Sequence, residues 1–187
     1  MRGGFLIVGL GFLFGVPAQA TTIDPANFAS GTDLGNPFLG IALETVRGQT
    51  NFVDNDPTPT LIDTIRQTGP SLGSVFARGS FFASANHPDW AADPEFGRLE
   101  IFKASFSIAI ETVAMTFHPG DLDTVVMGVF DAGNNLLSHQ FLRAGQPFTF
   151  SYTVGTTPIS YILAATADSG NLGALEFRLA QVPEPTI

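Results

Sequence analysis

The side chains that most often carry catalysis are few and scattered in this sequence. The histidines His87, His118 and His139 stand far apart, and no HxH or HExxH pattern pairs them for a zinc ion. There is no cysteine, so thiolate metal sites, disulfides and cysteine nucleophiles are excluded. A hydrolase elbow would need GxSxG, and the nearest match, around Ser74, lacks the flanking glycines. We therefore expect histidines in exposed turns and no nucleophilic serine.

Glu100 and Glu111 are the carboxylates that could serve a glycoside hydrolase. Both fall on candidate strands, and such an enzyme needs two carboxyl groups about 5 to 10 Å apart. Charged residues are also expected on the solvent side of any strand. We therefore expect both glutamates to be solvated, and we expect the protein not to be an enzyme.

A loop at residues 86–96, NHPDWAADPEF, carries the single tryptophan, Trp90. Sugar-binding faces stack a sugar ring on an exposed aromatic side chain and bond its hydroxyls with Asp, Asn or Arg. Trp90 with Asp89 and Arg98 fits that pattern. The alternative is that Trp90 covers the end of the hydrophobic core.

Oxygen-rich loops could hold calcium, which takes six to eight oxygen ligands. No loop matches the twelve-residue EF-hand pattern, and Asp and Asn are also the ordinary residues of turns. The candidate loops are Asp54-Asn55-Asp56, Asp121-Leu122-Asp123, Asp131 with Asn134 and Asn135, and Asp168 with Asn171.

Composition limits the elements that could position these side chains. The 187 residues suit one domain, and only 13% of them are charged. Eight basic residues against 17 acidic ones give a net charge of −9, which argues against nucleic acid as a partner. Eighteen phenylalanines with 20 glycines and 13 prolines indicate short apolar elements separated by turns, with most phenylalanines in the core.

Residues 1–20 have the pattern of a secretory signal peptide. Arg2 is followed by an apolar run from Phe5 to Val16, Pro17 breaks the run, and Ala18-Gln19-Ala20 fits the small-x-small cleavage pattern. The run is too short to span a membrane. We expect the protein to be exported, with one domain at residues 21–180 and a short tail at 181–187.

Beyond residue 20 the dominant pattern is alternation with period two. Phe106, Ile108 and Ile110 alternate with polar residues, and Val113, Met115 and Phe117 continue one residue out of phase, which predicts a bulge or strand break near Glu111-Thr112. Turn residues recur every 8 to 15 positions. The only candidate helix is Thr60 to Gln67. We predict an all-β fold, an antiparallel jelly-roll-like β-sandwich with at most one or two short helices.

The tail Val182-Pro183-Glu184-Pro185 resembles the sorting motif of PEP-CTERM proteins, which an exosortase handles in Gram-negative bacteria. The segments 125–142 and 158–177 also resemble the strands of a domain common in that group. The family signal continues into an apolar helix and a basic end, whereas this chain stops at Ile187. Either the anchor is truncated or this copy lost it and is released.

The resemblance implies a galactose-binding-like or jelly-roll sandwich associated with exopolysaccharide and biofilm matrix. It also implies a structural calcium between the opening loop and the last strand, held by Asp24 or Asn27 with Glu176. We therefore expect an exported, non-catalytic protein of the cell surface or extracellular matrix. Its expected partners are polysaccharide or other matrix components, and an exosortase if the full C-terminal signal exists. The alternative is a carbohydrate-binding module, with or without calcium.

Overall fold

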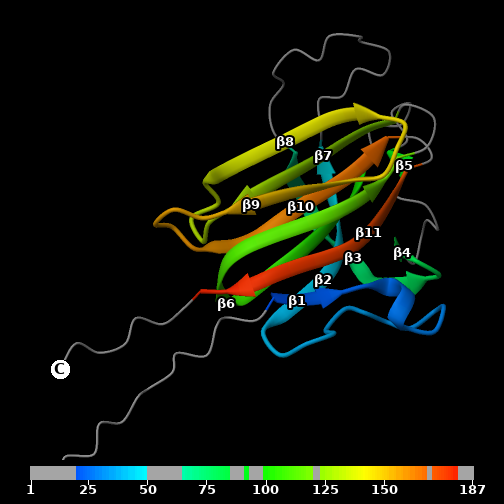
Figure 1. Ribbon diagram of the computed structural model, residues 1–187, viewed down its shortest axis with the longest axis horizontal. Helices are drawn as coiled ribbons and strands as arrows, with labels where there is room; N and C mark the ends of the chain where they lie inside the picture. Colours follow the sequence, from blue (N-terminus) through cyan, green and yellow to red (C-terminus); the bar gives the residue numbers. More distant parts are fainter. Residues whose placement is uncertain are drawn as a thin grey trace, which may run out of the picture.

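The computed structural model describes residues 20–49, 65–84, 91–92, 99–119, 123–167 and 170–180. In these ranges the chain forms eleven strands and one short 3-10 helix, η1 (Figure 1). The elements are β1 Ala20–Ile23, η1 Pro25–Asn27, β2 Ile41–Gln49, β3 Arg66–Arg78, β4 Phe81–Ser84, β5 Ala91–Ala92, β6 Leu99–His118, β7 Asp123–Phe130, β8 Leu136–Ala144, β9 Phe148–Thr153, β10 Ile159–Ala167 and β11 Asn171–Leu179.

The long strand β6 belongs to both layers of the fold. Its first half pairs with β2 and β10, inside a sheet that runs β4-β3-β2-β6-β10-β7-β8. Its second half pairs with β9 and β11, and β1 adds to the far side of β11. Every pairing is antiparallel except that of β5 with β10. The sheet curls over itself in Figure 1, which confirms the predicted all-β antiparallel sandwich.

The predicted phase slip in β6 is a β-bulge at Glu111. Leu179 of β11 pairs with Ile110, whereas the preceding residue, Arg178, pairs with Thr112, so Glu111 is the extra residue. The extra residue changes which positions of β6 face inward. Ile110 is buried before the bulge, and Val113 is buried after it. The bulge therefore keeps apolar side chains in the core as β6 passes from one layer to the other.

The inner core lies between the two layers and is rich in phenylalanine. Phe82 contacts Phe102 with ring centroids 5.0 Å apart, and Phe117 lies 5.6 Å from Phe148 and 5.3 Å from Phe150. Phe82, Phe102 and Phe117 are fully buried. The prediction that phenylalanines mainly form the core is confirmed for these residues.

A second, smaller core lies on the other face of the main sheet. Its buried residues come from β2, β6, β7 and β10 and from Ile65, just before β3. Strands β7 and β10 are therefore buried on both faces, which explains their uninterrupted apolar runs. The members of this core are Val46, Ile65, Ile101, Val126, Phe130, Leu163 and Ala165.

The prediction of a helix at Thr60 to Gln67 is wrong for residues 65–67, the part of it that the structure describes. Arg66 and Gln67 begin β3, and residues 60–64 lie outside the described ranges. Gly69 and Pro70 are residue types that commonly end an element, yet they lie inside β3. They fall where the register with β2 shifts, between the pairs Gly48–Gln67 and Val46–Ser71, so Pro70 is not required to donate a ladder hydrogen bond.

Two apolar segments in the first half of the chain form strands. Ile41 to Val46 lies in β2, and the apolar run Val75 to Ala83 is interrupted at Gly79, which takes φ 57° in the turn between β3 and β4. Within the described ranges the one helix has three residues, so no helix there can span a bilayer.

Candidate functional site

The structure does not describe most of the predicted site residues. The sugar-binding candidates Asp89, Trp90 and Arg98 and the sorting motif Val182 to Pro185 lie outside the described ranges. So do residues 1–19 of the predicted signal peptide. Three of the four candidate calcium loops, at 54–56, 121–123 and 168–171, fall wholly or partly there as well.

Of the predicted calcium ligands, Asp24 directly follows β1 and Glu176 lies on its partner strand β11, whereas Asn27 is the last residue of η1. β1 pairs with β11 so that Thr22 lies opposite Glu176, and Asp24 follows two residues along the chain. Asp24 Oδ1 already accepts a hydrogen bond from the backbone N–H of Ala26 at 2.9 Å, which caps η1. In the described part of the chain no three His, Asp or Glu side chains are grouped to hold a metal. Calcium here would depend on backbone, amide and water oxygens as well.

The turn at Asp131 uses its own oxygens internally. Asp131 Oδ1 accepts hydrogen bonds from the backbone N–H groups of Gly133 and Asn135, both at 2.8 Å, and Oδ2 accepts one from Asn135 Nδ2 at 2.9 Å. The side chain of Asn135 contributes most to lowering the pKa of Asp131 below its ordinary value. Asp131 therefore organises the turn between β7 and β8, as Asp commonly does.

Glu100 and Glu111 cannot act together as a glycosidase pair. They lie eleven residues apart on one strand, about 35 Å along β6, far beyond the separation that such a pair needs. Glu100 accepts a hydrogen bond from Ser84 Oγ at 2.5 Å, and Glu111 forms an ion pair with Arg178 at 3.4 Å. Both carboxylates thus have structural partners.

The histidine expectation is corrected at two positions. His118 is the last residue of β6 and lies partly buried with its ring 5.0 Å from that of Phe81, and burial lowers its pKa. His139 lies inside β8, and its side chain is also partly buried. Neither is an exposed turn residue, and His87 lies outside the described ranges.

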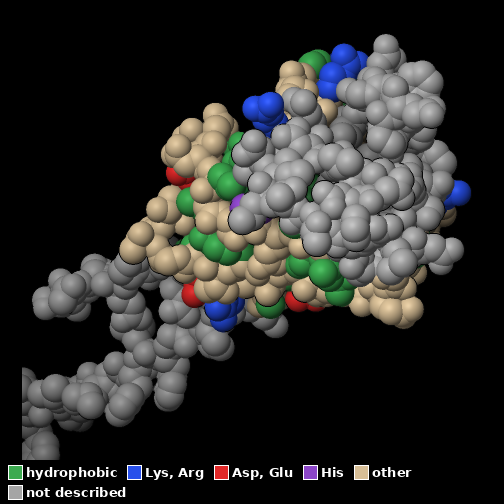
Figure 2. Space-filling model, turned by 90° about the horizontal axis from the view of Figure 1, so that it is seen from above, with side chains coloured by type: hydrophobic (Ala, Val, Ile, Leu, Met, Phe, Trp, Pro, Cys, Tyr) green, Lys and Arg blue, Asp and Glu red, His purple; other side chains and the backbone are tan. Residues whose placement is uncertain are grey.

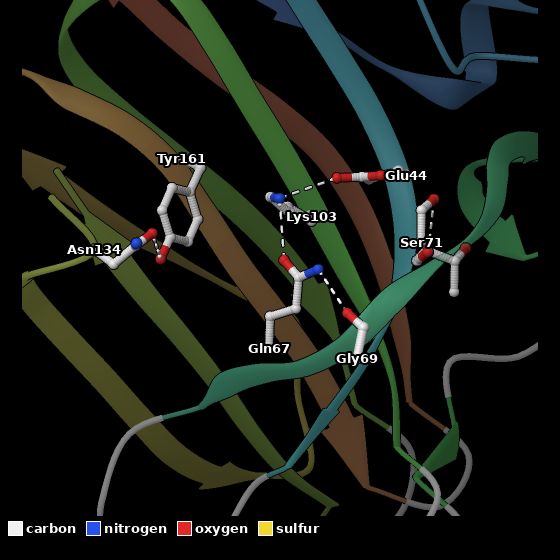
Figure 3. Close-up of polar contacts among 8 residues, drawn as sticks. Glu44, Gln67, Gly69, Ser71, Lys103, Asn134 and Tyr161 are labelled. Carbon is white, nitrogen blue, oxygen red and sulfur yellow. Dashed lines mark hydrogen bonds and ion pairs between the residues drawn. The ribbon is translucent and has the colours of Figure 1, made fainter. Parts of the chain in front are cut away.

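A polar cluster that the sequence analysis missed lies on the outer face of the main sheet (Figure 3). Lys103 Nζ of β6 lies 3.0 Å from Glu44 Oε1 of β2 and donates to Gln67 Oε1 of β3, also at 3.0 Å. It also lies over the ring of Tyr161 on β10, 5.3 Å from the centroid. We call Glu44, Gln67, Lys103 and Tyr161 the Lys103 network.

Tyr161 is held on both sides of its ring. Phe130 of β7 stacks on it with centroids 4.7 Å apart and planes 5° from parallel, and Lys103 approaches from β6 on the opposite side. The Tyr161 hydroxyl donates to Asn134 Oδ1 at 3.1 Å. Burial, followed by the charge of Asp131, raises the pKa of Tyr161. Phe130 and Lys103 therefore hold the orientation of the Tyr161 ring.

A hollow of about 520 Å³ adjoins the Lys103 network, and we call it the outer groove. Ala42 pairs with Ser105 on its floor, Ser105 in turn lies opposite Tyr161, and the next outward pair along the strands is Glu44 with Lys103. The groove is lined by Asn36, Phe38, Leu39, Ala42, Ser105 and Ser107, together with Gly40 and Ile41.

A glycine turn presents the apolar wall of the outer groove. Gly40 takes φ 82°, its carbonyl accepts from the Ser107 N–H at 2.8 Å, and a Cβ there would lie 2.9 Å from Ile108 Cγ2. The Phe38 carbonyl accepts from the Ile41 N–H at 3.1 Å. These contacts fix the turn that leaves Phe38 42% exposed and Leu39 98% exposed.

Sequence signals for this site were present but weak. Glu44 is a single charge between Leu43 and Thr45, Lys103 is a single charge between Phe102 and Ala104, and Phe38-Leu39 is an apolar pair before Gly40. Charges on strands usually face solvent for no special reason, so the pattern could not show that four strands bring these residues together.

Comparisons with known proteins add little. No protein-family model matches the chain, and no curated protein matches it. Among solved structures, the enzymatically active domain of tailspike protein 4 from bacteriophage CBA120 is similar, with a TM-score of 0.32 and 7% identity. The likeness covers 80% of this chain and 20% of that chain. A likeness at this level says nothing about the function of this protein.

Proposed function

We propose that this protein is exported and acts, without catalysing a reaction, as a β-sandwich component of the cell surface or extracellular matrix. The signal-peptide pattern supports export, and the PEP tail supports sorting by an exosortase if the full C-terminal signal exists. The observation that carries the proposal concerns the contacts that the acidic side chains make. Glu100, Glu111 and Asp131 are engaged in contacts within the fold, whereas the outer groove is lined by uncharged side chains.

The test is fractionation of the Gram-negative bacterium that makes the protein, followed by N-terminal sequencing. We expect the protein in the envelope, matrix or medium, with Thr21 as its first residue. The variant Leu10→Arg, which interrupts the apolar run, should stay inside the cell at full length. Wild-type protein recovered from the cytoplasm with Met1 or Arg2 in place would overturn the proposal.

A second candidate function is carbohydrate binding, favoured by the outer groove. Apolar side chains, hydroxyls and amides meet there, which suits sugars because sugars carry C–H faces as well as hydroxyl groups. Trp90 with Asp89 and Arg98 remains the site predicted from the sequence. The two candidate sugar sites can be told apart by measuring sugar binding. Trp90→Ala should weaken binding only if the sugar binds at the loop, and substitutions in the outer groove should weaken it only if the sugar binds in the groove.

A further inference from the structure

We propose that the outer groove binds an uncharged polysaccharide, one chain of which lies along β2 and β6 toward the Lys103 network. The inference rests on the carbohydrate-binding candidate and gives it a site and a ligand class. It differs from the loop site predicted at Trp90, because every residue that carries it lies on the outer face of the main sheet or in the turn before β2.

Two exposed apolar side chains, those of Phe38 and Leu39, form one wall of the groove. Phe38 and Leu39 are two of the four large hydrophobic side chains exposed in the described ranges, and they are adjacent in the chain. The other two, Leu142 and Leu179, lie on separate strands. Single exposed apolar residues are ordinary, whereas a pair at the rim of a hollow offers a surface for the C–H face of a sugar ring.

The floor of the groove offers uncharged hydrogen-bonding groups. Ser105 and Ser107 point outward from β6, and Asn36 adds an amide at the rim. Ser107 Oγ lies 3.3 Å from the Gly40 carbonyl oxygen, so its hydroxyl is already oriented by the turn. Hydroxyls and amides both donate and accept, which matches the hydroxyl groups of a sugar.

Charge favours an uncharged ligand over a polyanion. None of the residues that line the groove is charged, and the protein carries a net charge of −9, which would repel an acidic polysaccharide. The nearest cation along β6 is Lys103, and Glu44 neutralises it at 3.0 Å. In the described part of the face shown in Figure 2, the Lys, Arg, Asp and Glu side chains lie in separate places, and hydrophobic side chains show between the tan atoms of the backbone and other side chains.

The geometry allows more than one sugar residue to contact the protein. From Ser107 to Lys103 the floor follows β6 for four residues, about 13 Å. Tyr161 lies opposite Ser105 on the neighbouring strand, and its ring is held by Phe130 and Lys103. A ligand therefore meets a preformed surface, so little side-chain freedom is lost on binding.

The test is native affinity electrophoresis of the purified protein in gels that contain dextran, xyloglucan or galactomannan, with alginate as a polyanion. We expect at least one uncharged polysaccharide to retard the wild type. Phe38→Ala should weaken that binding about tenfold, because it removes the aromatic surface. Leu39→Ser should weaken it without affecting folding, since Leu39 is 98% exposed. Leu142→Ala is the matched control and should bind like the wild type.

Other outcomes overturn the inference in distinguishable ways. If Phe38→Ala and Leu39→Ser bind like the wild type while Trp90→Ala does not, the sugar site is the loop and only the groove is wrong. Retardation by alginate alone would contradict the uncharged ligand. If no polysaccharide retards the folded protein, the inference and the carbohydrate-binding candidate both fail, and the matrix role is then judged by fractionation alone.

Discussion

At the scale of single residues, two glycines set how closely elements approach on the outer face. A Cβ at Gly48 would lie 1.8 Å from Ile101 Cδ1, and a Cβ at Gly128 would lie 2.7 Å from Ile65 Cγ2. Ile101 and Ile65 are buried in the second core. Glycine is therefore required at both positions by packing and not by backbone conformation.

Gly48→Ala should destabilise the protein by about 2 kcal/mol, because the new methyl group would overlap a side chain that has no exposed surface to move into. Urea unfolding measures the change. Gly155→Ala is the control, since nothing lies within 4 Å of a Cβ there. Equal unfolding midpoints for the two variants would contradict the packing around Ile101.

Asp131 should make the stability of the folded protein fall at acidic pH. Its folded pKa lies below the ordinary value of about 3.9, so the carboxylate stabilises the fold fully above that pH. The stabilisation is lost as the pH falls through the lower folded pKa. Carbon-detected NMR titration should show this low pKa. Asn135→Ala should raise the pKa of Asp131, because the hydrogen bond from the Asn135 side chain contributes most to lowering it. An unchanged Asp131 titration in Asn135→Ala would contradict the turn geometry.

At the scale of elements, β6 depends on one extra residue. Deleting Glu111 should prevent folding, because removing the bulge turns the inward side chains on one side of it toward solvent. Glu111→Ala should fold normally and lose at most about 1 kcal/mol, since its ion pair with Arg178 is partly exposed and screened by solvent. Circular dichroism and thermal unfolding compare the two. A folded deletion variant would show that β6 can pair without the bulge.

The sequence allowed this bulge to be predicted but not the site. Alternation is a local signal, so the phase change between Ile110 and Val113 located the bulge directly. The helix prediction around Gln67 failed because the pairing of β3 with β2, which is a tertiary contact, outweighs local spacing. The Lys103 network joins residues of β2, β3, β6 and β10. Contacts between strands that are far apart in the sequence cannot be predicted from a local pattern.

At the scale of the whole molecule, the two ends of the described domain lie together. β1 pairs with β11, so Ala20 lies opposite Arg178, and the start of β1 and the end of β11 lie on the same side of the fold in Figure 1. The buried side chain of Ile23 fixes this edge to the inner core. The predicted signal-peptide junction therefore adjoins the strand that closes the fold, next to the predicted calcium site.

Calcium binding at that edge is tested on the intact protein. If Asp24 and Glu176 hold the ion, millimolar calcium should raise the Tm, a chelator should reverse the rise, and Glu176→Gln should abolish it. Glu111→Gln is the control and should keep the response. An identical Tm with calcium and with chelator would contradict the calcium prediction.

The central claim is that the outer face of the sandwich is a non-catalytic surface for uncharged polysaccharide. The most direct measurement is NMR of the labelled protein titrated with oligosaccharides of dextran, xyloglucan and galactomannan. We predict amide shifts at residues 38–42 and 105–107, with the oligosaccharide signals unchanged over hours. Shifts confined to other faces, no shifts at all, or new reducing-end signals that reveal hydrolysis would contradict it.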